Sequence, residues 1–336
     1  MAKQAVLLLA HGTPETVEQI PEYLRNVVSG RPLPQAVIEE IQHRYSLIGR
    51  SPLTEITLEQ GRLVATELAA GPQPVPVYVG MRNWRPYIPD VIRQMRADGV
   101  EEAAVVCLAP QNSRTSVGLY RRAVQAEAAG LRIDFTETWA QHPLLAEAFA
   151  ERLRPAFTRL SAEVGHAVQV LFTAHSVPCR TIQTPAAGQS QDAQPRLWPG
   201  AGGDPYAVEA KRTAALVAER VPGIPKWCFA FQSQGASGGP GSSVSPVSWI
   251  GPTVESTLDA LAAEGVRTLL LQPIGFLCDH VEILYDVDIL FRGYAAKLGI
   301  RLERPESLNA SPTLAMAVAD LARQGLARLQ AGAVAR

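Results

Sequence analysis

The amino-acid sequence predicts an α/β fold of two similar doubly wound parallel-sheet domains with a cleft between them. Short β-rich runs alternate with longer helical segments, the runs are apolar throughout, and one local pattern occurs in both halves. Continuously apolar runs are typical of parallel strands covered by helices on both faces. In chain order we expect strands at residues 5–10, 76–79, 103–108, 131–135, 168–173, 227–231 and 268–272.

The segments between these runs are rich in Ala, Leu, Glu and Arg, which favours helices. A last helix is expected at about residues 312–329, where it would cross back to the first domain. Residues 185–204 and 233–248 have the composition of loops. The second loop contains a Gly/Ser/Pro run and follows directly after a strand, so it is either a solvated connection or a flap at the mouth of a site.

The pattern that occurs twice places a histidine after one strand of each half. Residues 10–14 read Ala-His-Gly-Thr-Pro, and residues 174–178 read Ala-His-Ser-Val-Pro. A second pair, Asp-Gly-Val at 98–100 and Glu-Gly-Val at 264–266, recurs at nearly the same offset. The pairs indicate duplicated halves with ligand sites at the carboxyl ends of the strands. We therefore predict an N-terminal domain of residues 1–150, joined by a C-terminal helix of residues 310–336, and a second domain of residues 151–309.

Composition and charge exclude several classes of protein. Lys plus Arg number 31 and Asp plus Glu number 32, so a formal charge of −1 provides no field for nucleic acid. The longest apolar runs are far shorter than the ~20 residues of a membrane span, and the first residues lack a signal-peptide pattern. We therefore expect no transmembrane segment and a cytoplasmic location. The four cysteines form no Cys-x-x-Cys pair, which argues against structural zinc and thiol redox chemistry.

Common catalytic motifs are also missing from the sequence. It contains no G-x-G-x-x-G after a strand and no Walker loop, so the usual nicotinamide and ATP chemistry is not expected. H-E-x-x-H and G-x-S-x-G are absent as well, which leaves little support for Ser176 as a hydrolase nucleophile.

Two local features could carry chemistry. His175 closes a strand and titrates near neutral pH if exposed there, although a capping or core histidine is an equal alternative. Residues 273–288 concentrate acids and a histidine at a strand-to-helix junction. If Asp279 is the helix N-cap, Glu282 falls at the third helical position, and a capping box explains both residues structurally. Glu282 and Asp286 would share a helix face, which is either metal-facing or solvated.

Taken together, segments along almost the whole chain resemble ferrochelatases. The matching segments, in family order, are residues 11–14, 43–53, 173–178, 203–206, 231–235, 249–252 and 275–286. The resemblance implies a lyase of haem biosynthesis that inserts Fe(II) into a porphyrin in the cleft between two α/β domains. Fe(II) is then a substrate, and no tightly bound cofactor is expected.

By this resemblance, His175 and Glu282 are the catalytic residues and the metal ligands, and Asp279, His280 and Asp286 support them. Two pyrrole N–H protons must leave as the metal enters, so a base with a pKa near the ambient pH is needed. Neutral imidazole is also a suitable ligand for Fe(II), and a carboxylate opposite it can orient the imidazole or hold the incoming ion.

The N-terminal block is most similar to the coproporphyrin III type of bacterial ferrochelatase. On that match, His11, Arg44, Tyr45, Ser51 and Tyr120 are predicted to bind the porphyrin, because guanidinium and hydroxyl groups suit propionate carboxylates. Coproporphyrin III is therefore the favoured substrate, with protoporphyrin IX as the alternative.

Several positions depart from that type. His11 stands where a tyrosine is usual, Val28 where an arginine is usual, and Leu290 interrupts an acidic row. No cysteine follows Cys278, so the iron–sulfur cluster of some ferrochelatases is not expected.

Two other functions stay open on the sequence. His11 with Gly12 also resembles cobaltochelatases that act on sirohydrochlorin-type tetrapyrroles. A non-catalytic haem or tetrapyrrole carrier would use His11 or His175 as an axial ligand and would not need Glu282.

For a ferrochelatase, proteins of the haem pathway are the partners to expect.

Overall fold

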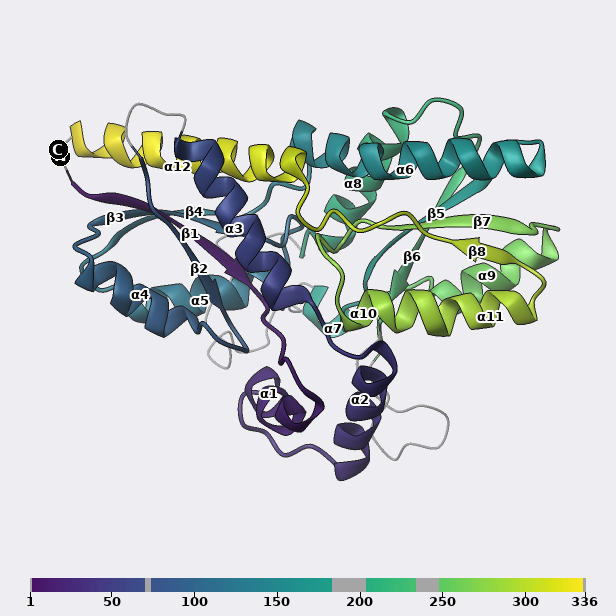
Figure 1. The fold of residues 1–336 in the computed structure, drawn as a ribbon, viewed down its shortest axis with the longest axis horizontal. Helices are drawn as coiled ribbons and strands as arrows, with labels where there is room; N and C mark the ends of the chain where they lie inside the picture. Colours follow the sequence, from purple (N-terminus) through teal and green to yellow (C-terminus); the bar gives the residue numbers. More distant parts are fainter. Residues whose placement is uncertain (1, 70–73, 183–203, 234–247, 335–336) are drawn as a thin grey trace, which may run out of the picture.

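The computed structural model describes residues 2–69, 74–182, 204–233 and 248–334, and these form two four-stranded parallel sheets side by side (Figure 1). The first sheet has the order β2-β1-β3-β4, and the second has the matching order β6-β5-β7-β8. The strands are β1 (Gln4–Ala10), β2 (Val77–Met81), β3 (Glu102–Cys107), β4 (Arg132–Thr136), β5 (Gln169–His175), β6 (Trp227–Gln232), β7 (Thr268–Pro273) and β8 (Arg301–Glu303). The predicted fold of two similar α/β domains is thereby confirmed.

Helices flank both sheets (Figure 1). They are α1 (Ile20–Val27), α2 (Gln35–Ile48), α3 (Leu53–Ala69), α4 (Ile88–Ala97), α5 (Val117–Glu127), α6 (Pro143–Val164), α7 (Cys179–Ile182), α8 (Tyr206–Glu219), α9 (Val254–Ala263), α10 (Val281–Leu284), α11 (Arg292–Lys297) and α12 (Pro312–Val334). A 3₁₀ turn, η1 (Val17–Gln19), precedes α1, and a π-helix, η3 (Asp286–Phe291), joins α10 to α11.

The seven expected strands all form, and none of their ends differs from the expected residue by more than two positions. The side chains of β1 show why its run is apolar throughout, since Val6 and Leu8 enter one core cluster and Leu7 and Leu9 another. Strand β8 was missed because three residues, the first of them the exposed Arg301, are too few to establish a pattern.

The repeated Gly-Val dipeptides, at residues 99–100 and 265–266, lie at equivalent helix ends in the two halves. Gly99 follows α4 with a φ of 77°, and Gly265 follows α9 with a φ of 85°. The next residue, Val100 or Val266, donates its N–H to a carbonyl of the last helical turn at 2.9 Å. Both sites are left-handed helix caps, where glycine is favoured because it lacks a Cβ.

Helix α12 lies along the first sheet, far from the strands that precede it in the chain (Figure 1). Arg328 pairs with Asp134 of β4 at 2.7 Å, and Gln330 donates to Gln4 of β1 at 3.0 Å. The predicted boundary after residue 150 falls inside α6, and the division into residues 1–150 and 151–309 stays a prediction.

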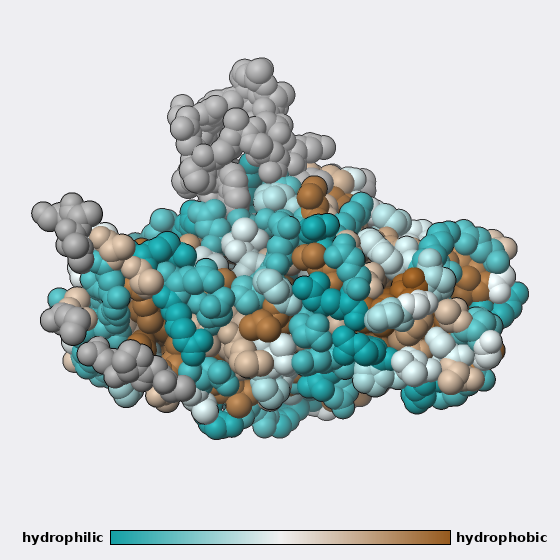
Figure 2. Space-filling model, turned by 90° about the horizontal axis from the view of Figure 1, so that it is seen from above, coloured by the Kyte–Doolittle hydropathy of each residue, from teal (hydrophilic) through white to brown (hydrophobic). Residues whose placement is uncertain are grey.

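The face that α12, α3 and α6 form is mainly hydrophilic, with small separated apolar areas (Figure 2). Isolated areas of this kind are normal on a folded protein. Among the described residues, no helix combines the length and apolar content that a membrane span needs.

Candidate active site at the strand ends

The two repeated histidines stand at equivalent places in the two sheets. His175 is the last residue of β5, and His11 follows β1 directly. Both β1 and β5 are inner strands of their sheets, and carboxyl ends of such strands are where doubly wound folds place ligands. The charges of His175, His280 and Glu282 all act on the pKa of His11, so groups from both halves converge here.

His175 forms a pair with Glu282 of α10. Its Nε2 atom lies 3.3 Å from Glu282 Oε1, and its Nδ1 atom contacts the Ser176 carbonyl oxygen. Both side chains of the pair are half-buried. The rings of Phe276 and Trp249 lie beside the imidazole, with centroids 6.2 and 6.4 Å away.

The two contacts of the imidazole determine how many protons it carries. Because a carbonyl oxygen can only accept, His175 Nδ1 must carry a hydrogen, and Nε2 must carry another to bond the Glu282 carboxylate. Burial by itself lowers the pKa of His175, but Glu282 outweighs burial and the pKa is raised. Burial raises the pKa of Glu282, yet the charge and hydrogen bond of His175 outweigh it and lower that pKa to about 2. Both shifts therefore favour the charged form of the pair, an imidazolium hydrogen-bonded to a carboxylate.

Glu282 is held in place through its backbone. Gln232, at the end of β6, donates from Nε2 to the Glu282 carbonyl at 2.9 Å, while its Oε1 accepts from Thr173 at 2.6 Å. The Gln232 carbonyl accepts from the Ser176 N–H at 2.6 Å. The ends of β5 and β6 therefore position both members of the pair.

The predicted capping box at Asp279 and Glu282 is wrong by one residue. His280 is the N-cap of α10, and its Nδ1 accepts from the Glu282 N–H at 3.2 Å. Glu282 is therefore the second helical residue, and its carboxylate faces His175 instead of turning back to the cap. Burial of His280, whose ring packs on Phe276 at 4.6 Å, lowers its pKa and favours the neutral acceptor.

His11 lies in a separate polar cluster of the first domain. Its Nε2 atom is 2.8 Å from the Tyr23 hydroxyl, and the Asn83 side-chain amide lies 3.1 Å from the same atom. Burial, assisted by the charge of Arg82, lowers the pKa of His11 to about 3. His11 therefore stays neutral across the physiological range.

Asp286, at the start of η3, is the second carboxylate near the pair. It accepts from the Ser233 hydroxyl at 2.5 Å, and Arg44 Nη1 of α2 lies 3.7 Å away. Burial and the neighbouring charge of Glu282 raise the pKa of Asp286 to about 6. Arg44 also lies over the ring of Tyr285, 5.1 Å from its centroid. The structure thus brings Arg44, predicted from the N-terminal block, to the acidic segment.

The remaining predicted porphyrin-binding residues are buried side chains of the first domain. Among the described residues, the hydroxyls of Tyr45 and Ser51 make no hydrogen bond of normal geometry, but they lie near enough for Ser51 to lower the pKa of Tyr45, which burial raises. Tyr120 of α5 is also buried, with the Arg82 guanidinium 5.6 Å from its ring centroid. Buried hydroxyls are normally paired, so the unpaired ones are candidates to bind a ligand.

Three contributors to the site escaped the sequence analysis. Tyr23 contacts His11, and Arg82 and Asn83 follow directly after β2, the neighbour of β1 in the sheet. For Arg82 and Asn83, the available signal is their position at the carboxyl end of a strand, the same signal that points to the two histidines.

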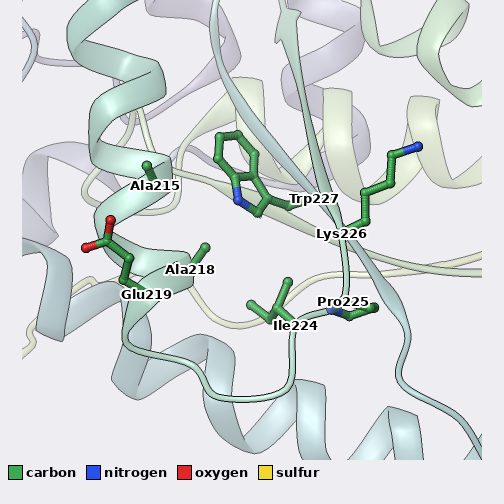
Figure 3. Close-up of a pocket in the computed structure, with 7 residues that line it drawn as sticks. All are labelled: Ala215, Ala218, Glu219, Ile224, Pro225, Lys226 and Trp227. Carbon is green, nitrogen blue, oxygen red and sulfur yellow. The ribbon is translucent and has the colours of Figure 1, made fainter.

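Other features lie outside this site or outside the described residues. In the described part of the chain, no three His, Cys, Asp or Glu side chains gather as a metal centre. The predicted loops at 185–204 and 233–248 fall almost entirely outside the described residues. A surface hollow between α8 and β6 contains no predicted site residue (Figure 3). It lies near Trp227, the first residue of β6, and thus at the opposite end of that strand from Gln232.

The fold is that of two-domain chelatases. The sirohydrochlorin chelatase SirB from Bacillus subtilis subspecies spizizenii, solved in complex with cobalt, matches with a TM-score of 0.52. The match covers 96% of this chain and 95% of that chain at 11% sequence identity, and such a likeness shows the fold alone.

The family follows from the sequence comparisons. The ferrochelatase family model matches residues 3–326. A ferrochelatase from Acidobacterium capsulatum is 60% identical over 98% of this chain and 96% of its own. A coproporphyrin III ferrochelatase from Mycolicibacterium vanbaalenii is 33% identical over 96% of this chain and 89% of its own. The chain belongs to the ferrochelatase family, the metal-inserting lyases of haem biosynthesis, as the sequence analysis predicted.

Proposed function

We propose that this ferrochelatase inserts Fe(II) into coproporphyrin III, with His175 and Glu282 as the groups that meet the metal and the pyrrole protons. The observation that carries the proposal is the pair itself, with Nε2 and Oε1 facing each other at 3.3 Å where β5 ends and α10 begins. A nitrogen and an oxygen at this separation can both bind one Fe(II) ion after the proton between them leaves.

The reaction releases two pyrrole protons for each Fe(II) that enters. His175 must be neutral to accept a proton or bind the metal, so its raised pKa sets the lower pH limit of activity. Asp286, with a pKa of about 6, is a second group that can exchange a proton near neutral pH. His11 does not take part in proton transfer because its pKa of about 3 keeps it neutral.

The choice of coproporphyrin III rests on the groups available for carboxylates. Coproporphyrin carries a propionate on every pyrrole ring, whereas protoporphyrin IX has vinyl groups in place of half of them. Arg44 and the buried hydroxyls of Tyr45 and Ser51, which make no hydrogen bond of normal geometry among the described residues, are donors that suit propionates. A relative named coproporphyrin III ferrochelatase, at 33% identity, supports the same choice.

The other predictions belong to this proposal. Fe(II) is a substrate, and the enzyme has neither a tightly bound cofactor nor an iron–sulfur cluster. It works in the cytoplasm, and proteins of the haem pathway supply its porphyrin and receive its haem. Tyr120 and His11 line the porphyrin site, and Asp279 and His280 support the catalytic pair.

Anaerobic Fe(II) insertion, followed by porphyrin absorbance, tests the proposal with coproporphyrin III and protoporphyrin IX in parallel. We expect faster consumption of coproporphyrin III and loss of turnover in His175→Ala. The exposed His166 provides the control His166→Ala, which should keep the wild-type rate. A preference for protoporphyrin IX would overturn the substrate, and equal rates for the two histidine variants would overturn the role of His175.

Glu282→Gln separates an enzyme from a carrier. The amide keeps the size of the side chain but loses its charge, so a chelatase should lose turnover while still binding porphyrin. A carrier would show no insertion in the wild type and unchanged haem affinity in the variant.

A further inference from the structure

The segment from Asp279 to Asp288 carries the acidic groups of the site, and one arginine joins its two ends. We propose that Arg304 is a positioning residue, which holds Asp279 and Asp288 together and thereby keeps Glu282 opposite His175. This inference rests on the proposed function of the His175–Glu282 pair. Arg304 itself follows β8 and contacts neither member of that pair.

The guanidinium of Arg304 donates hydrogen bonds to two carboxylates at once. Its Nε atom donates to Asp288 Oδ1 at 2.8 Å, and its Nη2 atom donates to Asp288 Oδ2 at 2.7 Å. The same Nη2 atom donates to Asp279 Oδ1 at 3.1 Å, and Nη1 donates to the Pro305 carbonyl at 3.0 Å. Only 10% of the Arg304 side chain is exposed, so solvent screens these charge-assisted bonds weakly.

Asp279 is fully engaged in holding this segment. Besides Arg304, its carboxylate accepts from Ser307 at 2.7 Å and from Asn309 at 2.9 Å. Its backbone N–H donates to Asn309 Oδ1 at 2.8 Å. With three hydrogen bonds on its carboxylate and one on its backbone, Asp279 anchors the start of this segment.

The anchor also reaches the first domain. Asn309 has a φ of 47°, a left-handed conformation that asparagine tolerates better than most residues. Its carbonyl accepts from Gln60 of α3 at 2.8 Å. The stretch from Arg304 to Asn309 therefore links α3 of one domain to the acidic segment of the other.

The segment needs such support because its own structure is weak. Helix α10 has four residues, and the η3 turn after it is a π-helix of six. Helices this short are not stable by themselves, and π-helical turns are rare and depend on their surroundings. The two acids of η3 have different partners, since Asp286 contacts Arg44 and Ser233, whereas Asp288 contacts Arg304 and, at 3.3 Å, the exposed Arg292.

Arg304→Lys tests directly whether the bridge from Arg304 to Asp279 and Asp288 matters. Lysine keeps the charge but cannot bridge both carboxylates in this geometry. We expect kcat for Fe(II) insertion to fall about tenfold or more, because small misplacements of reacting groups are costly, while KM for porphyrin stays within about twofold. Arg301→Lys, the same change on an exposed arginine of β8, should alter neither constant. Equal behaviour of the two variants, or a loss confined to KM, would overturn the proposal.

Asp288→Asn is the second variant, in case Arg304→Lys folds poorly. It keeps the shape of the side chain and removes the carboxylate that pairs with the Arg304 guanidinium. Combined with Arg304→Lys, it should lower kcat by less than the two single losses together, since both changes break the Arg304–Asp288 contact and Asp288→Asn in addition breaks only the exposed pair with Arg292. Fully additive losses would show that Arg304 and Asp288 act independently, contrary to the proposal.

Amide hydrogen exchange of the full-length protein gives a readout that does not depend on turnover. In Arg304→Lys, peptides covering residues 280–291 should exchange faster than in the wild type, and peptides from β1 and β5 should not. Unchanged exchange in residues 280–291 would overturn the proposed role of Arg304 in holding Asp279 and Asp288, even if iron insertion is confirmed. Faster exchange in a protein that inserts no iron would instead support the role of Arg304 and reject the proposed function.

Discussion

Nε2 of His175 lies 3.3 Å from Oε1 of Glu282, and Gln232 at the end of β6 bonds the backbone of Glu282 and that of Ser176, the residue after His175. The pair thus combines a strand end with a helix start, both held by the same glutamine. A group placed in this way has little freedom to move away from its partner, which makes its protonation sensitive to single substitutions.

Glu282→Gln should lower the pKa of His175. In the wild type, burial lowers this pKa and the carboxylate raises it to a net value above the usual one, so removing the charge leaves burial unopposed. We expect the acidic limb of any residual activity to move to lower pH and the rate at its plateau to fall by about a hundredfold or more. A pH–rate profile of wild type and variant measures both. An acidic limb that stays in place would assign it to another group.

Asp286→Asn should stabilise the protein at alkaline pH. The pKa of Asp286 is raised to about 6 in the folded state, above the unfolded value of about 3.9. The stabilising effect of that shift is complete below the unfolded pKa and is lost as the pH rises through the folded pKa. Above pH 6 the ionised side chain costs up to about 2–3 kcal/mol, which asparagine avoids. Urea unfolding at pH 5 and pH 8 should show the larger gain at pH 8, and a gain independent of pH would contradict this assignment.

Tyr45→Phe should separate stability from binding. The Tyr45 hydroxyl is buried beside Ser51 and makes no hydrogen bond of normal geometry among the described residues, so its removal should leave the free energy of unfolding unchanged or raise it by up to about 1–3 kcal/mol. If the hydroxyl binds a propionate, KM for coproporphyrin III should rise at the same time. The control is Tyr78→Phe, which loses a hydrogen bond to Asp98 of 2.6 Å and should cost about 1 kcal/mol of stability without changing KM. A loss of stability in Tyr45→Phe would show that its hydroxyl is paired.

Two glycines of α12 test how this helix packs on the first sheet. A Cβ at Gly325 would lie 2.9 Å from the Ala104 Cβ, whereas a Cβ at Gly332 would have nothing nearer than 3.8 Å. Gly325→Ala should therefore destabilise the fold by about 1–3 kcal/mol through overpacking. Gly332→Ala should stabilise it by up to about 1 kcal/mol through helix propensity. Thermal unfolding of both variants is the measurement, and equal effects would place α12 away from β3.

Much of the fold could be predicted because its signals are local. The apolar run of β1 reflects burial on both faces, and Gly99 and Gly265 mark helix ends that a single residue type favours. Strand β8 escaped because three residues carry too little pattern. The capping box at Asp279 failed because contacts from residues 304–309 compete for the carboxylate and leave His280 as the cap.

The sequence by itself determined the α/β alternation, the repeated histidines at strand ends and, through resemblance, the ferrochelatase family. Only the tertiary structure decided that Arg44 meets Asp286, that Arg304 and its neighbours bond Asp279, and that Tyr23 contacts His11. The physical reason is that strands, caps and turns depend on neighbouring residues. Each of those contacts instead joins segments that approach one another only when sheets and helices pack.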